Sequence, residues 1–165
     1  MLGGVALVGF MGVGKTTVGQ ALGQALKLPF LDLDQVVVEQ ESCSIETLFS
    51  ERGERAFRDA EKNALNRVLS GAPCVLSCGG GTPCQPGLMQ QLNDWGHTIF
   101  LNAPFAVIAE RAVDGGRPLW RNRSEALALY EKRLPVYKKA HIHLDASQPV
   151  SVIVDAAVRC LELRQ

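Results

Sequence analysis

Residues 9–16 read GFMGVGKT and match the pattern G-x-x-x-x-G-K-[ST] at every fixed position. The segment follows a short apolar run and precedes a stretch with helical spacing, which is the context that this pattern requires. Glycines let the backbone turn its N–H groups inward, and a helix N-terminus favours negative charge. Lys15 can reach the terminal phosphates of a nucleotide, and the Thr16 hydroxyl can bind Mg²⁺. The alternative is a glycine-rich turn with a chance lysine, and the context favours a phosphate-binding loop.

Two aspartates, Asp32 and Asp34, follow the second short apolar segment. Their spacing of two places both side chains on one face if the chain stays extended there, near the phosphates. Phosphate-binding loops of this kind need a second polar group near the metal, and the third apolar segment ends in Ser77 rather than in an acid. The alternative is that Asp34 only caps a helix that begins at Gln35.

Three arginines, Arg58, Arg117 and Arg133, are candidates to hold an anionic substrate. A planar guanidinium binds carboxylate or phosphate through two parallel hydrogen bonds. On residue type alone, a solvated surface arginine is the more common outcome. Residues 79–81 are three glycines directly after an apolar segment, and their unshielded N–H groups can approach a ligand at a strand edge. A flexible turn is the alternative interpretation of these glycines.

Five short apolar segments alternate with helical segments along the chain. Strands are predicted at 5–10, 30–33, 73–77, 97–101 and 142–144. Helices are predicted at 15–26, 35–41, 44–50, 54–69, 86–93, 104–112, 124–139 and 149–162. This alternation is typical of an α/β fold with a parallel sheet and helices on both faces. We expect one domain over residues 1–165, with a helical insertion at about 34–61 and a lid loop at about 112–123.

The bulk composition argues against several classes of protein. The 165 residues include 17 basic and 17 acidic side chains, so the formal net charge is zero. A nonspecific nucleic-acid or membrane-surface binder needs a basic excess and is not expected. The five cysteines form no CxxC pair, which favours thiols in a reducing compartment over a zinc site. No apolar stretch reaches the roughly 20 residues that cross a bilayer, and we expect a soluble, cytoplasmic monomer.

Taken in chain order, these motifs resemble the shikimate kinase family of P-loop proteins. Besides the phosphate loop, the resemblance rests on Phe30-x-Asp32-x-Asp34, Gly53-Glu54-x-x-Phe57-Arg58-x-x-Glu61, Gly79-Gly80-Gly81, Arg117-Pro118-Leu119 and Arg133-x-x-x-Tyr137. It implies a three-layer P-loop NTPase fold with a five-stranded parallel sheet. It also implies transfer of the γ-phosphate of ATP to the 3-hydroxyl of shikimate, in aromatic amino acid (chorismate) biosynthesis, with Mg²⁺ as the metal.

The resemblance further implies a role for each matched residue. Catalysis is assigned to Lys15, Asp34 and Arg117. Nucleotide binding is assigned to Gly12, Val13, Gly14, Lys15, Thr16, Thr17, Arg111, Arg117 and Gln148, with the segment 146–149 as a candidate side of the adenine pocket. Shikimate binding is assigned to Asp34, Phe49, Phe57, Arg58, Gly80, Gly81 and Arg133. The metal is assigned to Thr16, Asp32 and Ser77.

Two other functions stay open at this point. A gluconate-type or nucleoside-monophosphate kinase would share the fold and the phosphate loop, although the triple glycine and Phe57-Arg58 favour a compact carboxylate over a nucleotide as acceptor. A non-catalytic nucleotide-binding regulator is the second alternative. The intact set of Lys15, Thr16, Asp32, Asp34 and Arg117 argues against that alternative.

Overall fold

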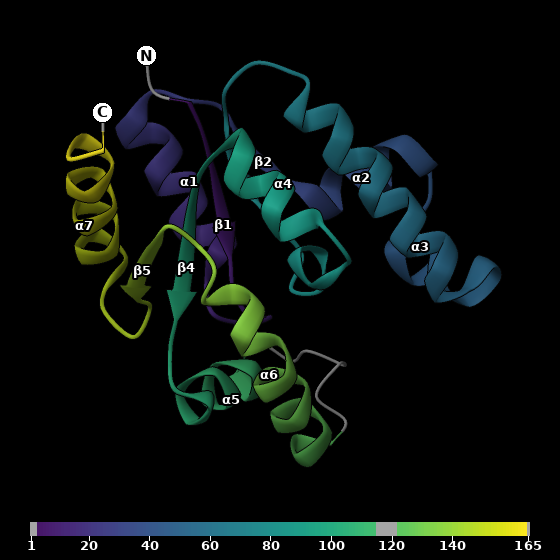
Figure 1. The fold of residues 1–165 in the computed structure, drawn as a ribbon. Helices are drawn as coiled ribbons and strands as arrows, with labels where there is room; N and C mark the ends of the chain where they lie inside the picture. The colour runs from purple at the N-terminus through teal and green to yellow at the C-terminus, as the bar shows by residue number, and fades with distance from the viewer. Residues whose placement is uncertain (1–2, 115–121, 165) are drawn as a thin grey trace.

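Five parallel strands form one sheet in the order β2-β3-β1-β4-β5 (Figure 1), in a computed structural model that describes residues 3–114 and 122–164. The strands are β1 (Gly4–Val8), β2 (Phe30–Asp32), β3 (Val75–Ser77), β4 (Gly96–Asn102) and β5 (Ile142–Asp145). Each lies within two residues of its predicted position. Because all the strands run in the same direction, the loops that follow them meet at one edge of the sheet.

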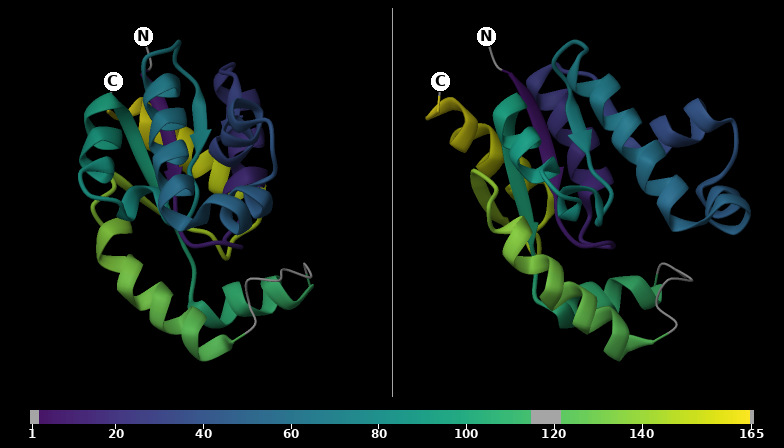
Figure 2. Two further views of the ribbon diagram at one scale, coloured as in Figure 1. Left: turned by 90° about the vertical axis from the view of Figure 1, so that its right-hand side faces the viewer. Right: turned by 45° about the vertical axis from the view of Figure 1, so that its right-hand side comes forward.

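Helices cover both faces of this sheet, so the predicted three-layer α/β architecture is confirmed. On one face, α1 (Lys15–Leu26) packs against α7 (Val150–Glu162), and α4 (Leu88–Trp95) lies on the other face. The predicted insertion contains α2 (Leu33–Glu41) and the first half of α3 (Ile45–Leu69), which pack together beyond β2. Figure 2 shows α5 (Phe105–Asp114) and α6 (Arg123–Tyr137) beneath the carboxyl ends of the strands.

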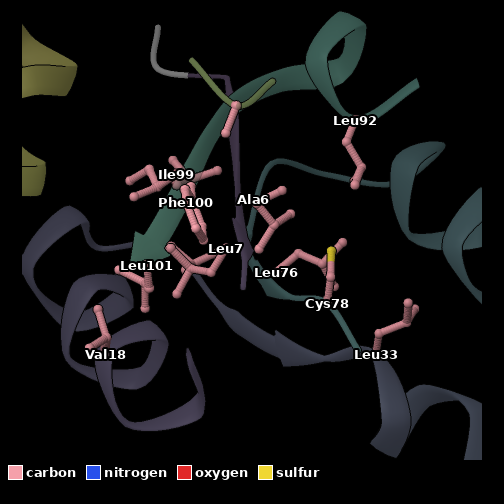
Figure 3. Close-up of a cluster of buried hydrophobic side chains, with 14 of the residues drawn as sticks. Ala6, Leu7, Val18, Leu33, Leu76, Cys78, Leu92, Ile99, Phe100 and Leu101 are labelled. Carbon is pink, nitrogen blue, oxygen red and sulfur yellow. The ribbon is translucent and has the colours of Figure 1, made fainter. Parts of the chain in front are cut away.

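The core lies between the sheet and its helices. All five residues of β1 are buried, as expected for a parallel strand that is covered on both faces. In Figure 3, Val18 of α1 and Leu92 of α4 approach the central strands from opposite sides. Burying one such aliphatic side chain stabilises the fold by about 1.5–3 kcal/mol. This packing gives the loops at the carboxyl edge a rigid base.

Local sequence explains the main irregularities of the helices. The helices predicted at 44–50 and 54–69 are the two parts of α3, which are separated by a kink at Gly53, where φ 81° and ψ 175° are a non-helical conformation that favours glycine. The Ser44 hydroxyl caps the start of α3 by accepting a hydrogen bond from the Thr47 amide at 3.0 Å. Helix α6 continues through Pro135 to Tyr137. Within the described residues, no helix has the length and apolar character needed to cross a membrane.

Candidate active site

The phosphate-binding loop joins β1 to α1 and has the backbone that its glycines predict. Gly9, Gly12 and Gly14 have φ values of 152°, 85° and 106°, which residues that carry a β-carbon rarely adopt. The loop encloses Lys15, which is 8% exposed and donates through Nζ to the carbonyl oxygens of Gly9 at 2.7 Å and Phe10 at 3.0 Å. A cationic group is therefore held inside this loop, where the sequence predicts that phosphate oxygens bind.

Asp32 connects this loop to the start of α2. One carboxylate oxygen accepts from the Thr16 hydroxyl at 3.0 Å, and the other accepts from the Asp34 amide at 3.0 Å. The interpretation that Asp34 caps this helix was wrong, because α2 begins at Leu33, directly after the strand, and its N-cap is Asp32. The chain also does not stay extended through Asp34, yet both carboxylates line one pocket of about 150 Å³.

The Asp34 carboxyl has an unusual electrostatic environment. Loss of solvent around it raises its pKa, and the negative charges of Asp32 and Glu61 raise the pKa further. The charges of Lys15 and Arg58 act in the opposite direction without cancelling the rise. The pocket is open to solvent, which screens these effects. A carboxyl group with a raised pKa beside two cations is suited to accept a proton from a bound hydroxyl.

The three residues predicted to hold a metal lie around the same pocket, together with Gly12, Gly14 and Thr17. Ser77 ends β3 directly beside Asp32 of β2 in the strand register, and it is 3% exposed. Thr16 completes the group through its hydrogen bond to Asp32. In the part of the chain that the structure describes, no three His, Cys, Asp or Glu side chains form a metal cluster. The predicted donors are the hydroxyls of Thr16 and Ser77 and the carboxylate of Asp32, which are hard oxygen ligands of the kind that Mg²⁺ prefers.

Two guanidinium groups lie directly over the triple glycine. A β-carbon placed on Gly81 would be 2.7 Å from both terminal nitrogens of Arg58, and one placed on Gly80 would be 3.1 Å from Nη1 of Arg133. A methyl group at either position would displace the end of an arginine side chain, so the glycines let both arginines approach the backbone. Arg58 comes from α3 and Arg133 from α6, so two separate elements bring their positive charges to one short loop.

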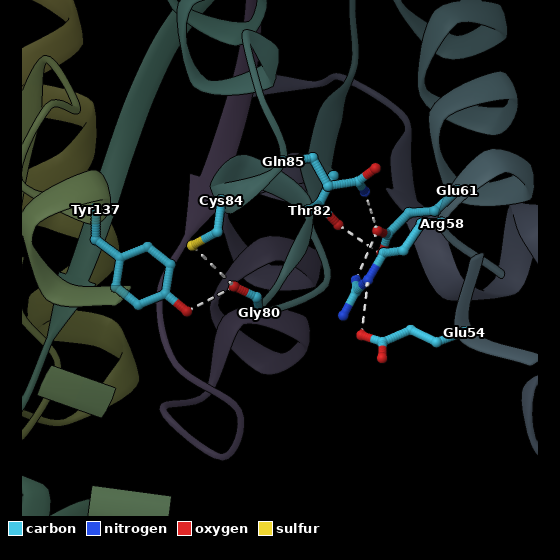
Figure 4. Close-up of polar contacts among 8 residues, drawn as sticks. All are labelled: Glu54, Arg58, Glu61, Gly80, Thr82, Cys84, Gln85 and Tyr137. Atoms are coloured by element: carbon cyan, nitrogen blue, oxygen red, sulfur yellow. Dashed lines mark hydrogen bonds and ion pairs between the residues drawn. The ribbon is translucent and has the colours of Figure 1, made fainter. Parts of the chain in front are cut away.

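A buried glutamate holds one of these arginines (Figure 4). Glu61 is 1% exposed and accepts hydrogen bonds from Arg58 at 2.9 Å, from the Thr82 hydroxyl at 2.8 Å and from the side-chain amide of Gln85. Glu54 lies 3.8 Å from the same guanidinium, but its side chain is 72% exposed. The Glu61 network ties α3 to the turn that follows the triple glycine.

Aromatic side chains lie beside Arg58 in the helical insertion. The rings of Phe49 and Phe57 are 4.6 Å apart between centroids, and the Arg58 guanidinium lies 5.1 Å from the centre of the Phe57 ring. Phe57 is buried, whereas Phe49 is 38% exposed. The two rings thus form an apolar wall next to the guanidinium, with the Phe49 ring open to solvent.

The residues predicted to contact adenine gather at the other end of the phosphate loop. Arg111 of α5 donates to the carbonyl oxygens of Val13 at 3.1 Å and Ala146 at 2.9 Å, so it joins the phosphate loop to the segment after β5. In that segment, the Gln148 side chain donates to Asp145 at 3.2 Å. The structure therefore brings Arg111 and the 146–149 segment together. Arg117 and most of the predicted lid fall within 115–121, outside the described residues.

Two residues of the site have no role in the sequence interpretation. Glu61 appears there only as part of a motif, although its spacing of three from Arg58 places both on one face of a helix and is a signal of pairing. Tyr137 likewise appears only as a motif position. Its hydroxyl donates to the Gly80 carbonyl at 2.6 Å, across 57 residues of sequence. Spacing along the chain gives no indication of such a contact.

Comparisons with known proteins identify the family of the chain. The family model described as shikimate kinase matches residues 11–162. The shikimate kinase of Ruegeria pomeroyi is 38% identical, over 98% of this chain and 86% of the relative. A crystal structure of shikimate kinase from Bacteroides thetaiotaomicron has a TM-score of 0.90 at 33% identity, covering 96% of this chain and 97% of that one. The structure of shikimate kinase from Acinetobacter baumannii in complex with shikimate has a TM-score of 0.88 at 32% identity, covering 99% and 93%. The chain therefore belongs to the shikimate kinase family and is an ATP-dependent kinase that acts on a small-molecule alcohol.

Proposed function

We propose that this chain transfers the γ-phosphate of ATP to the 3-hydroxyl of shikimate and that the pocket described above is its active site. The observation that carries the proposal is the pair of guanidinium groups over Gly80 and Gly81. Gly80 also lines the pocket that contains Lys15 and Asp34. An acceptor whose carboxylate pairs with Arg58 and Arg133 would place its ring near the phosphate loop. A compact hydroxylated carboxylate such as shikimate fits this arrangement.

The transfer step follows from the charges around Asp34. The acceptor oxygen attacks the γ-phosphorus, the bond from that phosphorus to the bridging oxygen breaks, and ADP leaves with the bonding electrons. The proton of the attacking hydroxyl passes to the Asp34 carboxylate. Lys15 stabilises the negative charge on the transferring group from inside the phosphate loop. Because phosphoryl transfer needs little covalent help, the main work of the residues is to position both substrates.

We assign the metal to the Thr16, Asp32 and Ser77 side chains. The number of carboxylates fits Mg²⁺, which usually takes one or two from protein and completes its shell with water and phosphate oxygens. When bound, Mg²⁺ neutralises charge on the β- and γ-phosphates. The hydrogen bond between Thr16 and Asp32 holds two of the donors side by side.

We assign the remaining contacts of ATP to the two ends of the phosphate loop. Gly12, Gly14 and Thr17, which line the pocket, would contact the phosphates, and Val13, Arg111 and Gln148 would contact the adenosine. The proposed apolar wall for the acceptor is Phe49 and Phe57. The catalytic role of Arg117, the lid, the monomeric state and the cytoplasmic location stay predictions from the sequence.

A coupled ADP-release assay tests the proposal with shikimate, gluconate and nucleoside monophosphates as competing acceptors. We expect ADP release with shikimate, and phosphorus NMR of the product should show a phosphate ester at the 3-hydroxyl. Turnover only with gluconate or with a nucleotide would contradict the proposed acceptor. A chain that binds ATP and releases no ADP with any acceptor would be a nucleotide-binding regulator instead.

A further inference from the structure

The hydroxyl of Tyr137 lies between two groups that the proposed function assigns to the acceptor carboxylate. It donates to the Gly80 carbonyl at 2.6 Å, and Figure 4 shows it pointing at that carbonyl from α6. A β-carbon on Gly80 would lie 3.1 Å from Nη1 of Arg133 and 3.5 Å from this hydroxyl, so all three groups meet at one point. Tyr137 and Arg133 are four residues apart on α6 and therefore share one face of that helix.

The tyrosine itself is fixed by the core. Its side chain is 0% exposed, and its ring packs against Phe100 of β4 with the centroids 5.5 Å apart. Burial raises the pKa of the phenol well above its ordinary value, against the opposing effects of the charge and the side-chain hydrogen bond of Arg133. The hydroxyl is therefore neutral at physiological pH, with one proton to donate and lone pairs to accept.

The Gly80 carbonyl determines where the next N–H group points. The oxygen of Gly80 and the N–H of Gly81 belong to one planar trans peptide and lie on opposite sides of it. Glycines on both sides leave this peptide with few steric limits on its rotation. The carbonyl also accepts a weak contact from Cys84 Sγ at 3.9 Å, so the bond from Tyr137 is the shorter and stronger of the two. Fixing the carbonyl therefore fixes the Gly81 N–H.

We propose that Tyr137 is a positioning residue that aligns the Gly81 N–H and the Arg133 guanidinium for the carboxylate of the acceptor. This inference rests on the proposed function and adds a residue that touches neither substrate nor nucleotide. The hydroxyl acts on one side through the peptide plane and on the other through its position beside the Arg133 guanidinium at Gly80. Its effect is thus confined to binding of the carboxylate and does not extend to ATP.

The test compares Tyr137→Phe with Tyr130→Phe in steady-state kinetics. Tyr130 is a matched control because it lies on the same helix and its hydroxyl also donates to a backbone carbonyl, that of Ala103 at 3.1 Å. In Tyr137→Phe we expect the KM for shikimate to rise about two- to tenfold, the range of one net hydrogen bond, while the KM for ATP and kcat hardly change. In Tyr130→Phe all three constants should stay near wild type.

Binding of shikimate and of an analogue with hydrogen in place of the carboxylate separates positioning from a general structural role. Tyr137→Phe should weaken the binding of shikimate and leave the binding of this analogue at the wild-type level, because the analogue has no acceptor for the aligned groups. Equal losses for both ligands, or kinetics identical to wild type, would overturn the proposal. Wild-type protein that fails to phosphorylate shikimate would instead overturn the proposed function.

An NMR measurement on the wild-type protein tests the predicted contact of the Gly81 N–H even if the Phe variant does not fold. We expect the Gly81 amide proton to move downfield on addition of shikimate, as a hydrogen bond to a carboxylate requires, and to stay in place with the analogue that lacks the carboxylate. An unmoved Gly81 amide in shikimate-bound protein would also overturn the proposal.

Discussion

The carboxylate of Glu61 lies 2.9 Å from Nη1 of Arg58, one turn away on α3, and is almost wholly buried while it holds that guanidinium over Gly81. The same carboxylate accepts from Thr82 and Gln85, so Arg58, the triple glycine and the following turn are fixed relative to one another. A long, flexible arginine side chain would otherwise lose rotamer freedom on binding a ligand. Pairing with Glu61 reduces that loss before the acceptor arrives.

The substitution Glu61→Gln tests this arrangement. The amide keeps the shape of the side chain but removes the charge that pairs with Arg58. It also places an NH₂ group, which can only donate, among the three donors Arg58, Thr82 and Gln85. We expect the free energy of unfolding to fall by about 1.5–3 kcal/mol and the KM for shikimate to rise. Urea unfolding and acceptor kinetics measure the two effects.

The matched control is Glu54→Gln, because Glu54 approaches the same guanidinium from an exposed position and should contribute little. Equal effects in the two variants would contradict the assigned role of Glu61.

The substitution Lys15→Ala should remove most of the phosphoryl transfer and leave the fold intact. Lys15 Nζ donates to two carbonyl oxygens of the loop, those of Gly9 and Phe10, whereas the hydrophobic core lies beneath the loop. We expect kcat to fall about 100-fold or more, as for loss of one group that stabilises developing charge. Lys62→Ala, which removes an exposed lysine of α3, is the control and should retain wild-type turnover. Near wild-type kcat in Lys15→Ala would refute the assignment of the phosphate loop.

The parts of the site that were predictable from sequence are those that local chemistry determines. The phosphate loop needs glycines at positive φ, a lysine and a hydroxyl within eight residues, and few other structures need that combination. The strands were recognisable because each is a short apolar run that ends in polar residues or glycine. Since parallel strands send their following loops to one edge, Asp32, Ser77 and Gly80 could be expected near one another.

The parts that were missed depend on contacts between distant segments. Glu61 meets Thr82 and Gln85 across 21 and 24 residues, and Tyr137 meets Gly80 across 57. No periodicity in the chain encodes these distances. The helix cap was misassigned for a different reason: the change from β2 to α2 occurs within one residue, and propensity does not locate so abrupt a boundary. Tertiary contacts of Asp32 with Thr16 help to place it.

The substitution Gly81→Ala should weaken acceptor binding by displacing Arg58. Gly81 has φ −88° and ψ −13°, which alanine adopts without strain, so the added methyl group acts through its volume. That carbon would be 2.7 Å from both terminal nitrogens of Arg58, which must move. We expect the KM for shikimate to rise roughly tenfold with little change in the KM for ATP.

Gly3→Ala serves as the control for this substitution, because a β-carbon there has no atom within 4 Å. An unchanged shikimate KM in Gly81→Ala would show that the guanidinium can bind the acceptor from another position. A parallel rise in the KM for ATP would place Gly81 in the nucleotide site instead.

The proposed chemistry needs Asp34 in its ionised form, whereas the folded state favours its protonated form. Burial and the charges of Asp32 and Glu61 raise the pKa of Asp34 above its ordinary value of 3.8, so the folded protein holds this proton more tightly than the unfolded chain. The protonated Asp34 carboxyl therefore contributes its full stabilisation of the fold below pH 3.8, and this contribution is lost as the pH rises through the folded-state pKa.

Asp34→Asn should thus abolish transfer, because it removes the proton acceptor, and should raise Tm at pH 7. The first turn of α2 favours an acidic side chain and offsets part of this gain. Calorimetry across pH 3–8, with the exposed Asp59→Asn as the control, should show a difference in Tm that shrinks toward acid pH. A lower Tm at pH 7, or a difference that does not depend on pH, would show that the ionised carboxylate stabilises the folded state.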